Sequence, residues 1–275
     1  MTSLVTNAYN NTFYNIHILH PPDLTKNSKK FLSSVEERYP DKCSILYFNM
    51  GNKYKYLPLN YKLTTPAYYR LSLPNLLPKI ERIIWLDSDT LVFEDLTELI
   101  QLDMKGNLIM GFLDGFPDAL NEFGFKNATV LNSGVLLMDL DSLRKYNYSQ
   151  RIEDFIFRNK NRLSQQDQTI INVVMLGLIG SLPPKYGIWT FDSKKVGKEY
   201  LNKLFVHLKY DEKEFFYALE HPAIIHFIWP KPFWKLYTKF YNKWWDYAKL
   251  TGYYWEIYFK SPIQKRENKR HFSSN

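Results

Sequence analysis

The chain has 275 residues, of which 45% are hydrophobic and 17% aromatic, a composition that excludes a disordered protein. Cys43 is the single cysteine, so an internal disulfide framework and a thiolate metal cluster are both excluded. The formal net charge of +8 favours anionic partners such as phosphorylated metabolites, nucleic acid or an acidic membrane surface.

Taken in chain order, residues 1–11 read as the end of a helix that leads into a turn, where an α/β chain usually opens with a buried strand. Short apolar runs rich in β-branched and aromatic residues then predict strands, and helical patterns between them predict helices. The predicted strands are 13–19, 43–48, 82–87, 107–114, 133–140 and 223–228. The predicted helices are 26–39, 66–73, 152–159 and 166–175.

Apolar strands that alternate with helices predict an α/β fold with a mostly parallel central sheet. From about residue 233 the pattern changes to helical periodicity rich in aromatic and basic residues. We therefore expect one α/β domain over residues 1–232 and a C-terminal helical region over residues 233–275. Apolar runs stay shorter than the roughly 18 residues of a spanning helix, and no basic-then-apolar leader opens the sequence, so we expect a cytoplasmic protein.

Two carboxylates, Asp87 and Asp89, follow the predicted strand 82–87. The period of two in an extended chain sends both side chains to the same side, where they repel each other unless a cation lies between them. In open α/β sheets, ligands bind at the carboxyl ends of the strands. The pair therefore predicts a metal site, with a structural turn as the alternative. A second pair, Asp139 and Asp141, precedes a helix start, where capping by Asp141 or Ser142 explains it.

Carboxylates favour a hard cation, Mg²⁺ or Mn²⁺. His226 ends another apolar strand, and as a third ligand it would favour Mn²⁺, because imidazole suits transition metals better than it suits Mg²⁺. A structural histidine is the alternative. Lys231 follows five residues later.

The motifs around these residues resemble, in order, those of glycosyltransferase family 8. This family comprises retaining nucleotide-sugar enzymes that include glycogenin and the bacterial lipopolysaccharide galactosyl- and glucosyltransferases. The resemblance covers about residues 1–260 and implies a single GT-A-type, Rossmann-like nucleotide-sugar domain. It is carried by the segments 64–99, 111–116, 131–140, 164–172, 224–233 and 244–257. The strand and loop with which the family opens, and which hold uracil and ribose, have no match here. We therefore expect the first strand to be missing, either because the sequence starts after it or because the chain lacks it.

The resemblance implies a metal-dependent retaining enzyme that moves glucose or galactose from UDP-glucose or UDP-galactose to a glycan acceptor such as lipopolysaccharide, or to a lipid-linked glycan. Mn²⁺ is the implied cofactor, with Mg²⁺ as the alternative, and its ligands are Asp87, Asp89 and His226. The implied catalytic residues are Asp114, Asp167 and Gln168. The implied donor-binding residues are Arg70, Asp87, Ser88, Asp89, Asn132, Ser133 and Lys231.

The chemistry suits these residue types, because the leaving diphosphate gains negative charge that a metal and Lys231 would stabilise. Carboxylate and amide oxygens would stabilise the positive charge on the sugar ring. Several residues also have structural alternatives: Arg70 on a helix surface, Asp114 in a turn and Asp167 as a helix cap. Gln168 on a solvent face is a further alternative, as are Asn132 and Ser133 bonding their own loop backbone.

A non-catalytic module that recognises a glycan or nucleotide is the competing hypothesis, because the nucleoside-binding strand is missing. Binding of nucleic acid is not expected, since the basic residues lack a recognition motif. The stretch 235–260 mixes Trp, Tyr and Lys as interfacial helices do, which predicts peripheral contact with the inner face of an anionic membrane. Packing of these helices on the domain is the alternative. The sequence does not indicate whether the protein is a monomer or an oligomer.

Overall fold

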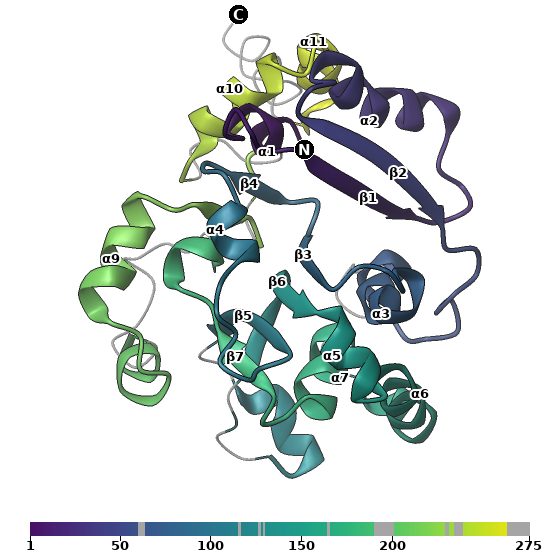
Figure 1. Ribbon diagram of the computed structural model, residues 1–275, viewed down its shortest axis with the longest axis vertical. Helices are drawn as coiled ribbons and strands as arrows, with labels where there is room; N and C mark the ends of the chain where they lie inside the picture. The colour runs from purple at the N-terminus through teal and green to yellow at the C-terminus, as the bar shows by residue number, and fades with distance from the viewer. Residues whose placement is uncertain are drawn as a thin grey trace, which may run out of the picture.

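The computed structural model describes residues 1–59, 64–114, 117–125, 128, 130–163, 166–189, 201–228, 231–233 and 239–262 (Figure 1). The strands are β1 (Tyr14–His20), β2 (Cys43–Asn49), β3 (Arg82–Leu86), β4 (Thr90–Val92), β5 (Ile109–Asp114), β6 (Val130–Asp139), β7 (Ile179–Ser181), β8 (Ile188–Trp189) and β9 (Ile224–His226). The α-helices are α1 (Thr2–Thr6), α2 (Lys26–Arg38), α3 (Leu73–Leu76), α4 (Thr97–Ile100), α5 (Leu140–Lys145), α6 (Tyr148–Asn159), α7 (Gln166–Val174), α9 (Glu212–Glu220), α10 (Tyr241–Lys249) and α11 (Tyr254–Lys260).

Tighter 3-10 turns form η1 (Thr65–Ser72), η2 (Pro117–Phe123), η3 (Lys160–Arg162) and η4 (Pro184–Tyr186), and η5 (Lys203–His207) is a π-helical turn. The predicted helix 66–73 is thus a 3-10 segment that gives way to α3. Pro74 lies in the first turn of α3, where its missing N–H costs no helical hydrogen bond, whereas inside a continuous α-helix it would break one.

Three sheets hold the described strands, in the orders β1-β2, β3-β6-β5-β7 and β4-β9-β8. The expectation of a mostly parallel sheet needs correction, because the four-stranded sheet is mixed. β6 runs antiparallel to both β3 and β5, while β5 and β7 are parallel. β6 is the next strand after β5 in the chain and returns beside it after the 3-10 turn η2, and consecutive strands that pair after such a return run antiparallel.

The first described element is the helix α1, and no strand precedes β1 among the described residues. Within the described segments, β1 pairs in parallel with β2 alone and β3 pairs with β6 alone, so no ladder of described strands joins the two sheets. In Figure 1, β1, β2 and α2 lie to one side of the central sheet.

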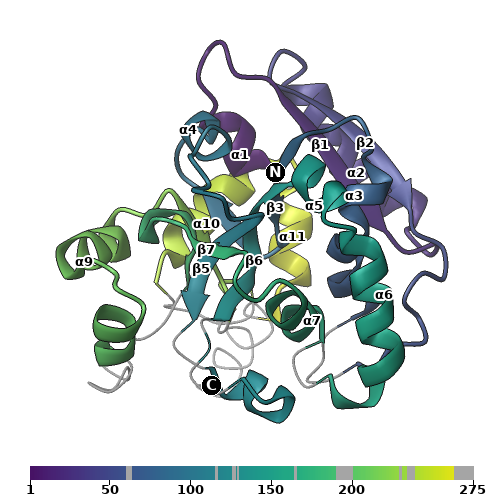
Figure 2. The same cartoon turned by 60° about the horizontal axis from the view of Figure 1, so that its bottom comes forward.

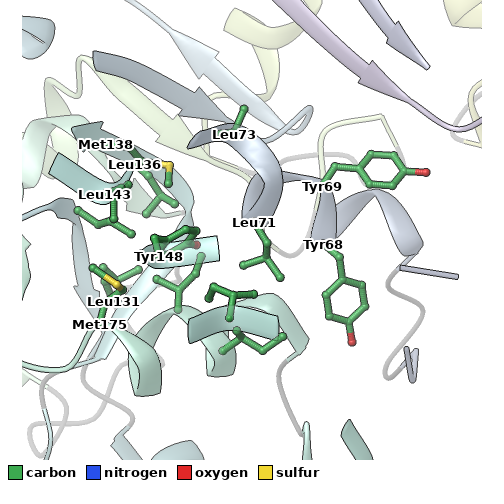
Figure 3. Close-up of a cluster of buried hydrophobic side chains, with 14 of the residues drawn as sticks. Tyr68, Tyr69, Leu71, Leu73, Leu131, Leu136, Met138, Leu143, Tyr148 and Met175 are labelled. Carbon is green, nitrogen blue, oxygen red and sulfur yellow. The ribbon is translucent and has the colours of Figure 1, made fainter. Parts of the chain in front are cut away.

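Alternate side chains of β3 face two different hydrophobic clusters. Ile83 and Trp85 pack against the larger cluster, whereas Ile84 and Leu86 pack against a second one. The larger cluster joins η1 and β6 to α5, α6 and α7, which cover that face of the sheet (Figure 2). Its buried members include Tyr68, Leu71, Leu131, Leu136, Met138, Leu143, Tyr148 and Met175 (Figure 3). The core thus fixes η1 and α7 against the strands that carry the acidic pair.

The C-terminal helices pack onto the body of the protein. Asn7 donates to the hydroxyl of Tyr247 in α10 at 2.7 Å, and Phe31 of α2 contacts Tyr253 with ring centroids 4.6 Å apart. Among the described residues, no helix has both the length and the apolarity needed to cross a membrane.

The second acidic pair behaves as a helix start. Asp139 caps α5, with its side chain accepting a hydrogen bond from the backbone N–H of Ser142 at 2.9 Å. The cap is therefore Asp139 rather than Asp141 or Ser142. Asp141 is partly exposed, with 43% of its side chain accessible, and pairs with Lys145 at 2.6 Å.

Candidate active site

The turn between β3 and β4 brings Asp87 and Asp89 close to His226. β4 pairs with β9 so that Thr90 lies opposite His226, and the backbone N–H of Phe227 donates to the carbonyl of Asp89 at 2.9 Å. His226 Nε2 lies 3.1 Å from Asp89 Oδ1 and 3.8 Å from Asp87 Oδ2. One ligand atom from each of the three residues lies within 4.8 Å of the others. The predicted ligands are therefore brought together in space.

This donor set fits a divalent cation. Two carboxylates supply hard oxygen ligands, and a buried imidazole supplies a nitrogen that Mn²⁺ accepts more readily than Mg²⁺ does. Lys231 Nζ lies 2.5 Å from Asp89 Oδ2. Burial acts to raise the pKa of Asp89, but hydrogen bonds and charge from His226 and Lys231 outweigh it and lower the pKa to about 2. Asp89 is therefore anionic at neutral pH and available to a cation.

Asn132 and Gly134, both on β6, define the position of the imidazole. Asn132 Oδ1 lies 3.2 Å from His226 Nδ1 and accepts the backbone N–H of Gly134 at 3.0 Å. An acceptor at Nδ1 favours the tautomer that leaves Nε2 free for a metal. A Cβ on residue 134 would lie 2.1 Å from His226 Cε1, so only glycine leaves room for the ring.

Arg70 is buried, with 3% of its surface exposed, and links three parts of the site. Its Nη2 donates to Asp87 Oδ1 at 2.8 Å, its Nη1 donates to the carbonyl of Ser133, and its Nε lies 3.0 Å from Asp167 Oδ2. Nε donates its hydrogen to the carbonyl of Ala67 at 3.0 Å, so the contact with Asp167 is an ion pair without hydrogen-bond geometry. The alternative of a surface helix arginine is therefore excluded.

Asp167 lies in the first turn of α7 and is almost completely buried. Burial raises its pKa to about 6, and the negative charge of Asp87 adds to this effect, while Arg70 and a hydrogen bond from Ser133 oppose it. A carboxyl that keeps its proton to an unusually high pH is typical of functional sites, although buried ion pairs also produce such shifts.

Gln168 and Asn172 attach α7 to β6. Gln168 Oε1 accepts the backbone N–H of Ser133 at 3.2 Å, so its side chain points toward the sheet and the solvent-face alternative is excluded. Asn172 accepts from the N–H of Leu131 at 2.8 Å and donates to the carbonyl of the same residue at 2.9 Å. These bonds fix the position of α7 relative to β6, and therefore also the position of Asp167.

The remaining predicted residues occupy different settings. Ser88 is exposed in the turn between the two aspartates. Asp114 ends β5 opposite Val130, but its side chain lies outside the described residues. Ser133 is buried beside Arg70 and Gln168.

Sequence reasoning missed three residues of this site: Trp85, Gly134 and Asn172. Trp85 Nε1 donates to Asp87 Oδ1 at 2.8 Å. A signal for it was present, because Trp85 lies two positions before Asp87 and so on the same side of the strand. No comparable local pattern marks Gly134 or Asn172, since their partners lie on other elements.

Comparisons with known proteins agree with this geometry. The family model described as glycosyl transferase family 8 matches residues 1–237. The chain is 29% identical over 194 residues to general stress protein A of Bacillus subtilis strain 168, a match that covers 68% of this chain and 65% of that protein. The chain thus spans less than two thirds of the length of this relative.

Two solved structures show the same fold at 18% identity. The bifunctional glycosyltransferase WbbM matches with a TM-score of 0.71 over 94% of this chain and 48% of its own. The galactosyltransferase LgtC, solved with donor and acceptor sugar analogues, matches with a TM-score of 0.62 over 87% of this chain and 95% of its own. The GT-A-type α/β fold expected from the sequence is thereby confirmed.

Proposed function

The chain belongs to glycosyl transferase family 8, and from this premise we propose that it is a metal-dependent retaining glycosyltransferase. The proposed donor is UDP-glucose or UDP-galactose, and the proposed acceptor is a glycan such as lipopolysaccharide. One observation carries the proposal: Asp87, Asp89 and His226, from two elements far apart in the sequence, place their ligand atoms within 4.8 Å of one another.

The residues around this group suit transfer from a sugar diphosphate. Asp87, Asp89 and His226 would hold Mn²⁺, which when bound acts as a Lewis acid toward the leaving diphosphate. The ammonium of Lys231, already beside Asp89, would bind a diphosphate oxygen and balance its growing charge. Each of these roles places positive charge at the leaving group.

On the sugar side, we assign Asp167 and Gln168 to the donor ring, with Asn132 and Ser133 beside them. Arg70 supports this assignment, because it holds Asp167 while it also binds the metal ligand Asp87. Carboxylate and amide oxygens suit the positive charge that develops on the ring when the sugar–diphosphate bond breaks. We also propose Asp114 as a catalytic residue, on the basis of the family motif at residues 111–116 in which it lies.

The function is tested with the full chain, UDP-glucose or UDP-galactose, and Mn²⁺ with and without a chelator. We expect release of UDP that depends on Mn²⁺ and falls at least about 100-fold in Asp89→Ala, because a direct metal ligand contributes more than the 10–100-fold of an outer partner. Asp141→Ala is the matched control, since it removes a partly exposed aspartate from the second acidic pair. Equal activity of Asp89→Ala and the wild type would refute the proposal. Failure of UDP and Mn²⁺ to bind would favour a non-catalytic module that recognises a glycan.

We further propose that the C-terminal helices contact an anionic membrane surface, where a lipid-linked acceptor would lie. Trp255 and Phe259 on α11 are 65% and 58% exposed, and their rings stack 5.9 Å apart. Lys249 and Lys260 end the last turns of α10 and α11. Exposed aromatic rings beside lysines are typical of interfacial helices.

Co-sedimentation tests this contact with vesicles of phosphatidylglycerol and of phosphatidylcholine. We expect the protein to bind the anionic vesicles, and we expect this binding to be weaker in the double variant Trp255→Ser/Phe259→Ser. Binding that the double substitution does not change would refute the assignment of this surface.

A further inference from the structure

Trp85 lies beside the proposed metal site but has no part in the function described above. It stands on β3 two residues before Asp87, and its ring packs against the larger hydrophobic cluster. Its Nε1 donates to Asp87 Oδ1 at 2.8 Å. An indole N–H is a donor only, so it cannot bind a metal itself and can act only through the carboxylate.

Two donors meet at the same oxygen of Asp87. Arg70 Nη2 also donates to Oδ1 at 2.8 Å. A carboxylate oxygen offers about two lone-pair sites, so both sites of Oδ1 are occupied and Oδ2 is left for a cation. Oδ2 is the oxygen of Asp87 that lies 3.8 Å from His226 Nε2. Asp87 therefore presents one oxygen toward the position that it shares with Asp89 and His226.

Trp85 also holds the second donor in place. The guanidinium carbon of Arg70 lies 4.8 Å from the centroid of the Trp85 ring. A planar guanidinium stacks well on an aromatic face, and this contact restricts its rotation. One indole thus orients Asp87 directly through its N–H and indirectly through Arg70, and it adds no charge that would compete with a cation.

We propose that Trp85 is a positioning residue that, together with Arg70, fixes Asp87 as a one-oxygen metal ligand. This inference rests on the proposed function, because it presupposes a divalent cation held by Asp87, Asp89 and His226. Partners that orient metal ligands typically contribute 10–100-fold to metal affinity or activity.

The test is Trp85→Phe in the full chain, since phenylalanine keeps an aromatic ring beside Arg70 and removes only the N–H. Binding of Mn²⁺ in the presence of UDP is followed by electron paramagnetic resonance, which reports both the free-ion signal and the spectrum of the bound ion. We expect Trp85→Phe to bind Mn²⁺ at least about 10-fold more weakly than the wild type and to give a changed spectrum of the bound ion, because Asp87 is then free to rotate. The thermal unfolding midpoint should stay near that of the wild type.

Trp245→Phe is the matched control, because Trp245 is a buried tryptophan of the C-terminal helices whose Nε1 has no hydrogen-bond partner among the residues that the structure describes. It should bind Mn²⁺ as the wild type does. Unchanged affinity and spectrum in Trp85→Phe, with normal binding by the wild type, would overturn this inference and leave the proposed function standing. An equal loss in both tryptophan variants would also overturn it, because it would indicate general loosening. Absence of Mn²⁺ binding in the wild type would overturn both proposals.

Discussion

Gly134 is the position where a single methyl group should disable the proposed metal site. It lies on β6 against the ring of His226, and a Cβ there would stand 2.1 Å from Cε1, 2.3 Å from Nδ1 and 2.8 Å from Nε2. Carbon atoms in contact lie about 3.5–4.0 Å apart, so the ring must retreat by roughly 1.4 Å in Gly134→Ala. Metal sites tolerate changes in ligand distance of only about 0.2 Å.

A displacement of this size should remove His226 from the coordination sphere. We expect the affinity for Mn²⁺ in the presence of UDP to fall at least about 100-fold, since loss of a direct ligand exceeds the 10–100-fold effect of an outer partner. Overpacking should also lower the free energy of unfolding by about 1–3 kcal/mol. The assay combines a Mn²⁺ titration, the rate of UDP release and urea unfolding.

Gly124→Ala separates the two effects. Gly124 has a φ of +85°, and no atom of the described part of the chain lies within 4 Å of a Cβ there, so alanine strains the backbone without touching the site. It should lose stability and keep its affinity for Mn²⁺. If Gly134→Ala binds Mn²⁺ as tightly as the wild type, the reasoning about the close approach of His226 is wrong.

Two further predictions concern α7. Because the pKa of Asp167 is raised from 3.8 to about 6, this group stabilises the fold fully below pH 4, and the stabilisation of about 3 kcal/mol is lost as the pH rises through 6. Asp167→Asn should lack this pH-dependent component when urea unfolding is measured from pH 4 to 7, and a pH profile equal to that of the wild type would contradict the assignment. Asn172→Ala orphans the backbone N–H and carbonyl of Leu131, which should lower the free energy of unfolding by about 1–3 kcal/mol for each group. Gln150→Ala on the exposed face of α6 is its control, and equal stability of the two variants would refute the role of Asn172.

Much of the local structure could be predicted from the sequence because it depends on neighbouring residues. Strands β1, β2 and β3 and helices α2 and α7 appear where the apolar periodicity places them, with ends shifted by at most one residue. The sequence also predicted the end of a helix in residues 1–11, where α1 lies. α9 was missed, although Asp211 caps it by accepting the N–H of Glu214 at 2.8 Å.

The candidate site was predicted in part for the same reason. Asp87 and Asp89 carry a local signal, two charges after an apolar run, and His226 carries a weaker one at the end of another run. The roles of Arg70 and Gln168 looked ambiguous in the sequence, because a polar residue on a helix is equally compatible with solvent and with a buried partner. Their burial and their bonds to Asp87 and Ser133 decide the question.

The sequence by itself therefore determined the class of the fold, the positions of most strands and the acidic pair that a cation would stabilise. Only the tertiary structure decided that β6 runs antiparallel to its neighbours, that Thr90 lies opposite His226, and that Trp85 and Arg70 share one oxygen of Asp87. The physical reason is that periodicity and capping act between residues a few positions apart. Strand register and the meeting of buried charges instead depend on how segments remote in the chain pack together.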